Sequence, residues 1–152
     1  MVEISTQQYK SQQLPRPVEV GVTRLPGGGL EATNSRGARL LMSSDDPSGF
    51  TPVELLLAAI AGCTAIDVDL LTSRRAEPER FDVRVSGAKV KDDQGANRLE
   101  SVAVEFSVRF PEGEDGDRAR AMLPVALQQS HDRLCTVGRT VELGTPITIT
   151  HE

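Results

Sequence analysis

Two cysteines are the residues of this chain whose type could carry covalent redox chemistry. Cys63 lies in a long apolar run, and Cys135 lies far along the chain beside a second apolar stretch. Two thiols that a fold brings together can form a redox pair that cycles between the reduced state and a disulfide. A free cysteine can equally pack as a small hydrophobic side chain. Both interpretations stay open from the residues alone.

The run around Cys63 predicts a long helix packed in the interior, because residues 52–68 are apolar on nearly every side. Thr51 and Pro52 suit the N-cap and the first helical position, and Glu54 fits a capping box. Asp67 follows Cys63 by one helical turn and would disfavour its thiolate if the side chains meet. On a continuous helix His131 would lie one turn before Cys135 and lower its pKa.

The remaining elements follow from hydrophobic periodicity and turn residues. The chain predicts strands, two helices and short turns in an α+β order with antiparallel hairpins. The predicted strands are 18–23, 30–33, 38–42, 80–91, 99–110 and 147–150, and the predicted helices are 51–74 and 117–131, with Pro124 inside the second. Residues 1–16 are expected to form a loose arm and residues 17–152 a single domain.

Composition and charge exclude several functions. The net charge of −5 and the 3% aromatic content leave neither a basic stripe nor stacking surfaces for nucleic acid. The N-terminus lacks the pattern of a signal peptide, and charged residues interrupt the apolar run, so we expect a cytoplasmic protein that does not bind membranes. Cys63, Cys135, His131 and His151 lack the short spacings of zinc ligands, so no metal is expected.

At these same cysteines the chain resembles a known family. The segment Phe50-Thr51-Pro52-Val53-Glu54-Leu55-Leu56-Leu57-Ala58-Ala59-Ile60-Ala61-Gly62-Cys63 and the later block Leu134-Cys135-Thr136-Val137 are similar to those of the OsmC/Ohr family, the osmotically inducible and organic hydroperoxide resistance proteins. The resemblance runs from about residue 18 to the C-terminus. It implies an OsmC-like fold, in which antiparallel sheets wrap around two long central helices of an intertwined homodimer.

The resemblance also implies a function and roles for particular residues. It implies a thiol peroxidase acting on organic alkyl or lipid hydroperoxides, with Cys63 as the peroxidatic thiol and Cys135 as the resolving thiol. An arginine of the early strands, Arg24 or Arg39, would hold the thiolate. No cofactor is required, and an external dithiol, for which the family suggests a lipoylated protein, would reduce the Cys63–Cys135 disulfide.

One departure from the family pattern keeps other functions open. Val53 stands where the better-studied peroxidases of the family carry an acidic residue, and Glu54 one place later points away from Cys63 on an ideal helix. The helix sequence is closest to the YhfA-like branch. Two alternatives on the same fold therefore remain, a binding protein for an apolar ligand and a thiol redox sensor with little turnover.

Overall fold

The computed structural model describes residues 16–44 and 46–151. The chain divides into two compact units, residues 1–51 and residues 52–152, and each unit is described by itself. The arm predicted for residues 1–16 lies outside the described residues except for Arg16. The prediction of a single domain over residues 17–152 remains a prediction.

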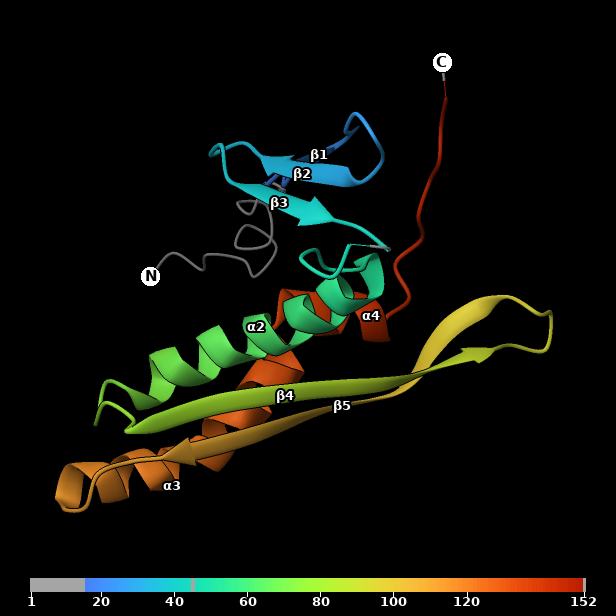
Figure 1. Ribbon diagram of the computed structural model, residues 1–152. Coiled ribbons are helices and arrows are strands. Elements are labelled where there is room, and N and C mark those ends of the chain that lie inside the picture. The colour runs from blue at the N-terminus through green and yellow to red at the C-terminus, as the bar shows by residue number, and fades with distance from the viewer. Residues whose placement is uncertain (1–15, 45, 152) are drawn as a thin grey trace, which may run out of the picture. The chain divides into compact units, whose positions relative to one another are not determined.

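The first unit contains a three-stranded antiparallel sheet (Figure 1). Its strands, in sheet order, are β1 (Val20–Arg24), β2 (Leu30–Asn34) and β3 (Arg39–Met42). Gly27, Gly28 and Gly29 connect β1 to β2 with φ angles of 82°, 106° and 73°. These are left-handed conformations that glycine adopts without steric cost, so the glycine run allows the tight turn of this hairpin.

The second unit combines a long hairpin with helices (Figure 1). Its elements are α2 (Pro52–Thr72), β4 (Arg80–Lys91), β5 (Asn97–Arg109), α3 (Glu114–Gln129), the π-helical turn η2 (Ser130–Leu134) and α4 (Thr136–Glu142). Strands β4 and β5 pair antiparallel. The predicted strands 80–91 and 99–110 and the predicted start of the first helix therefore agree closely with the structure.

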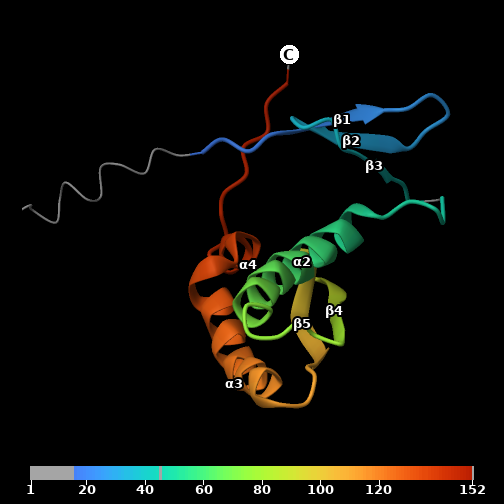
Figure 2. The same ribbon diagram turned by 90° about the vertical axis from the view of Figure 1, so that its left-hand side faces the viewer.

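Helix α2 is the element around which the second unit packs. It contacts β4 along the hairpin, and it also contacts α3, the η2 turn and α4 (Figure 2). Alternate side chains of the hairpin are half-buried, which matches the period-two pattern of the sequence. Within β5 the half-buried side chains are Leu99, Val104, Phe106 and Val108. The arrangement brings β5, α2 and the segment around Cys135 together.

One prediction about the last third of the chain is wrong, and one helix there was not predicted. Residues 147–150 form no strand, and the side chains of Ile147 and Ile149 are 88% and 90% exposed. Their alternation favours a strand, but a strand also needs a partner edge, which no local pattern supplies. The short helix α4 was not predicted, because Gly138 and four β-branched residues give it a weak helix propensity.

The fold class is confirmed, since the chain combines helices with antiparallel sheets. Helix α2 is long and apolar enough to cross a membrane by length and composition alone. It carries Glu54, Asp67 and Asp69, and helices from the interior of water-soluble proteins share this composition.

Candidate functional site

The structure places the two cysteines against each other. Cys63 lies in the middle of α2 and is half-buried, and its thiol interacts electrostatically with the thiol of Cys135. Burial raises the pKa of the Cys63 thiol, and the neighbouring Cys135 and the charge of Asp67 raise it further. The backbone N–H of Val137 acts in the opposite direction and lowers the pKa. Cys63 therefore needs a further cation to become a thiolate at neutral pH.

Cys135 occupies a special position at the start of α4. It ends the η2 turn in an extended conformation and serves as the N-cap of α4. Its sulfur accepts a hydrogen bond from the backbone N–H of Gly138 at 3.2 Å, the position that a serine or aspartate oxygen takes in common N-caps. A Cβ atom at Gly138 would lie 3.3 Å from this sulfur, so the glycine leaves it room. The side chain of Cys135 is 2% exposed.

Thr64, the residue after Cys63, also touches the sulfur of Cys135. Its hydroxyl lies 3.1 Å from the carbonyl oxygen of Ile60 and 3.6 Å from the sulfur. A hydroxyl has one proton and cannot donate to both at once. Because the contact to the carbonyl is shorter, Thr64 is free to accept the S–H proton of Cys135 while it donates to Ile60.

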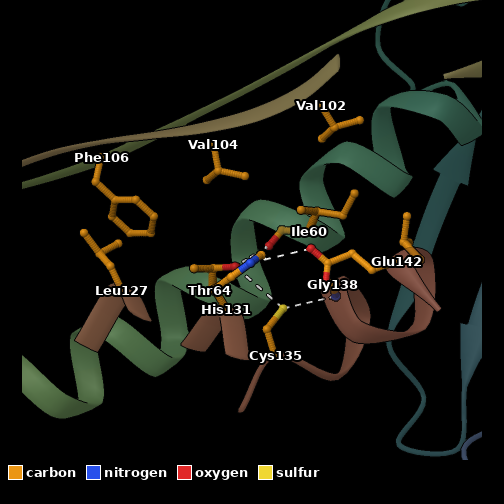
Figure 3. Close-up of a pocket in the computed structure, with 11 residues that line it drawn as sticks. Ile60, Thr64, Val102, Val104, Phe106, Leu127, His131, Cys135, Gly138 and Glu142 are labelled. Atoms are coloured by element: carbon orange, nitrogen blue, oxygen red, sulfur yellow. Dashed lines mark hydrogen bonds and ion pairs between the residues drawn. The ribbon is translucent and has the colours of Figure 1, made fainter. Parts of the chain in front are cut away.

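A cavity of about 530 Å³ opens beside this sulfur. Figure 3 shows that side chains of β5 face Cys135 across the cavity from α2 and α4. The apolar lining residues are Ile60, Val102, Val104, Phe106, Leu127 and Val141. The volume suits a small organic molecule. The cavity can therefore hold an apolar compound next to Cys135, whereas Cys63 does not line it.

The polar part of the cavity lining comes from η2 and α4. His131 and Glu142 line it, and Nδ1 of His131 lies 3.6 Å from a carboxylate oxygen of Glu142 (Figure 3). Arg139 lies 3.7 Å from the other oxygen of the same carboxylate. The α-helical geometry on which the predicted placement of His131 beside Cys135 depended is replaced by the η2 turn. The imidazole lies beside the Glu142 carboxylate, which Arg139 also contacts.

The two candidate arginines lie on the first sheet, at the end of β1 and the start of β3. Arg39 donates two hydrogen bonds to the carboxylate of Glu31 on β2, at 2.6 and 3.0 Å. This contact holds the pKa of Glu31 below its usual value. Arg24 makes no ion pair among the residues that the structure describes. The guanidinium of Arg24 is therefore the more available of the two.

Sequence reasoning missed several residues of this site. Ser130, Gly138 and Glu142 carry no motif, and each contributes through tertiary contacts that depend on η2 and α4. Asp67, by contrast, gave a local signal, its distance of one helical turn from Cys63. Its hydrogen bond to Ser130, at 2.8 Å, joins α2 to η2.

Comparison with known proteins shows the family. The family described as OsmC-like protein matches residues 44–150 of the chain. An uncharacterised protein of Mycobacterium tuberculosis is 32% identical over 118 residues, which are 76% of this chain and 82% of that protein.

Solved structures support the same fold at lower identity. A hypothetical protein from Aquifex aeolicus superposes with a TM-score of 0.67 at 19% identity, covering 86% of this chain and 91% of its own. An OsmC-like protein of unknown function from Vibrio cholerae gives a TM-score of 0.66 at 16% identity and covers 84% of this chain and 95% of its own.

Proposed function

Because the chain belongs to the OsmC-like protein family, we propose that it is a cysteine-based peroxidase that reduces organic hydroperoxides. The observation that carries the proposal is the contact between the thiols of Cys63 and Cys135 beside an apolar cavity. An adjacent second thiol is what converts a sulfenic acid into a disulfide before further oxidation. Membership of the family supports a role in peroxide-related stress.

The proposed reaction balances with the two thiols and one peroxide. The Cys63 thiolate attacks one oxygen of the O–O bond, becomes a sulfenic acid and releases an alkoxide that takes a proton and leaves as an alcohol. The Cys135 thiol then attacks the sulfenic sulfur, so that water leaves and the disulfide forms. An external dithiol reduces this disulfide by two exchange steps and is itself oxidised to a disulfide.

Turnover with different peroxides and reductants tests the proposal. Purified protein should consume cumene hydroperoxide faster than hydrogen peroxide, because the cavity buries the aromatic group and offers little to a small polar molecule. Dihydrolipoamide should support turnover better than glutathione, since a dithiol closes its own disulfide in the second exchange. Absence of consumption with every reductant would contradict the proposal.

The cavity wall gives a prediction about substrate choice. Val104→Thr keeps the shape and the strand propensity but puts a hydroxyl on the wall. We expect kcat/KM for cumene hydroperoxide to fall about 3- to 10-fold, because about 1 kcal/mol of apolar contact is lost. The rate with hydrogen peroxide should change less than about twofold.

A matched control uses the same substitution on the same strand. Val108 is half-buried on β5 like Val104 but does not line the cavity. Val108→Thr should leave the ratio of the two peroxide rates unchanged. Equal effects of both variants on cumene hydroperoxide would mean that the cavity is not the substrate site.

We propose that the protein works as a homodimer, as the resemblance implies. Helix α2 leaves Ile66 and Leu70 70% and 53% exposed within one chain, although most of its other residues are apolar. A second copy would cover such a surface. Light scattering should give twice the mass of one chain, and Ile66→Asp should shift this toward a single chain. A monomeric wild-type protein would contradict the dimer.

The proposed location is the cytoplasm, where reducing systems keep most thiols free and a disulfide persists only as an intermediate. Alkylation of thiols in intact cells should trap Cys63 and Cys135 mostly reduced before peroxide stress and oxidised after it. A disulfide that is permanent before any stress would argue for a structural bridge instead.

A second candidate function rests on the cavity alone. Its apolar lining and its volume also suit a protein that binds an apolar ligand without chemistry. Such binding would survive Cys63→Ser, whereas peroxide consumption would not. A fluorescent fatty-acid probe that binds wild type and variant equally, together with no peroxide turnover, would favour this function.

A further inference from the structure

A π-helical turn separates α3 from Cys135. Residues Ser130–Leu134 form this turn, and the backbone N–H of Cys135 donates to the carbonyl oxygen of Ser130 at 2.9 Å. Single π turns are rare, and they occur frequently at functional sites. The direction in which Cys135 leaves α3 therefore depends on how Ser130 is held.

Ser130 is held from the opposite helix. Its side chain is 0% exposed, and its hydroxyl donates a hydrogen bond of 2.8 Å to the carboxylate of Asp67 on α2. A hydrogen bond to a charged group is among the stronger contacts in a protein interior. The bond joins the first residue of η2 to the helix that carries Cys63.

Asp67 stands one turn after Cys63 on α2, where the two side chains share a face. For the first step of the reaction this position is unfavourable, because a negative charge beside a thiol opposes formation of the thiolate. The contact with Ser130 connects Asp67 to the second step of the reaction, the closure of the disulfide. Its carboxylate fixes the start of the turn that ends at the resolving thiol.

We propose that Asp67 and Ser130 are positioning residues that hold Cys135 against Cys63 and so speed the closure of the disulfide. The inference rests on the proposed function and assigns a second-step role to residues that do not touch the peroxide. A displacement of about 1 Å can cost on the order of 100-fold in rate. Loss of the hydrogen bond should therefore slow closure and leave the attack on peroxide intact.

Three variants separate the hydrogen bond from the charge. Ser130→Ala removes the donor, and Asp67→Ala removes the acceptor and the charge. Asp67→Asn removes the charge but keeps an amide oxygen that can accept from Ser130. Asp132→Ala is the control, because Asp132 belongs to the same turn but accepts a bond from Gln128 on the exposed side.

The measurement is quenched-flow mass spectrometry after one equivalent of cumene hydroperoxide, with dimedone to trap the sulfenic acid. Ser130→Ala and Asp67→Ala should close the disulfide at least about tenfold more slowly than wild type and accumulate the dimedone adduct at Cys63. For Ser130→Ala the rate of the first oxidation should stay within about twofold of wild type. Asp67→Asn should close like wild type and oxidise faster at neutral pH, since the opposing charge is gone. Asp132→Ala should match wild type throughout.

A second readout needs no peroxide. Oxidised glutathione forms a mixed disulfide with one thiol of the reduced protein. The second protein thiol then attacks this mixed disulfide, which closes the internal disulfide and releases glutathione. The rate of closure depends on how well the second thiol is placed. We expect this closure to slow in Ser130→Ala and Asp67→Ala and to be preserved in Asp67→Asn. Closure as fast as wild type in Ser130→Ala would overturn the inference. A wild type that closes with glutathione but ignores peroxide would instead overturn the proposed function and leave the positioning intact.

Discussion

Cys63→Ser should abolish the consumption of cumene hydroperoxide, with kcat/KM falling by at least about 10³-fold, as when a nucleophile is removed from other enzymes. The loss follows because serine cannot form a sulfenic acid, and the remaining thiol, Cys135, is only 2% exposed. Ferrous-xylenol or coupled assays of remaining peroxide measure the effect. The variant should keep the circular dichroism spectrum of the wild type, since serine is close in size to cysteine.

Cys135→Ser is the matched variant for this experiment. It should still lose one equivalent of peroxide at a rate near that of the wild type, because Cys63 is unchanged. It should then stop at the sulfenic acid and fail to turn over with a dithiol that acts on disulfides. If Cys135→Ser lost the first oxidation and Cys63→Ser kept it, the roles of the two thiols would be reversed.

Arg24→Met should slow the oxidation of Cys63 about 10- to 100-fold at pH 7. Burial raises the pKa of Cys63, so the thiolate is scarce at neutral pH unless a cation stabilises it. The family resemblance implies that an arginine of the early strands supplies that cation, and Arg39 is already bound to Glu31. Loss of such a cation would raise the pKa of Cys63 further and lower its thiolate fraction at pH 7.

The pH dependence identifies the cause of this loss. The rate of Arg24→Met should recover as the pH rises through the raised pKa, because above it both proteins hold Cys63 as the thiolate. Arg24→Lys should keep most of the rate at pH 7, and Arg39→Met should change it little. A loss in Arg24→Met that is constant at every pH would contradict a role in stabilising the thiolate.

The elements that carry local periodicity could be predicted from sequence. The hairpin strands show alternation that sets β4 and β5, and the Thr-Pro start fixes the beginning of α2 at Pro52. Glycine-rich turns located the early strands within two residues. These features depend only on residues that are close in the sequence, so they can be recognised in a single sequence.

The parts that depend on tertiary contacts could not be predicted. The η2 turn rests on the buried contact between Ser130 and Asp67, and α4 rests on a thiol as its N-cap. Neither the η2 turn nor α4 has a local sequence pattern that would predict it. The strand predicted at residues 147–150 fails for the complementary reason, since its local pattern is strong but it has no partner strand among the described residues.

The candidate site also has a part that could be predicted from sequence and a part that could not. Cys63 and Cys135 were chosen for their chemistry and their resemblance to family positions, and the structure brings their thiols together. The cavity beside them combines side chains from β5, α2, α3 and α4, and sequence periodicity does not show which of these elements converge. His131 was expected beside Cys135 on an unbroken helix, but a π turn takes the place of that helix, and Nδ1 of His131 lies 3.6 Å from Glu142.

The most direct test of the proposed chemistry is the intact mass of the reduced protein after one equivalent of cumene hydroperoxide. We predict rapid loss of both free thiols and of about 2 Da per chain, the mass of two hydrogen atoms, with Cys63→Ser unreactive. Retention of both thiols and an unchanged mass over minutes would contradict a peroxidase and favour the apolar-ligand binder.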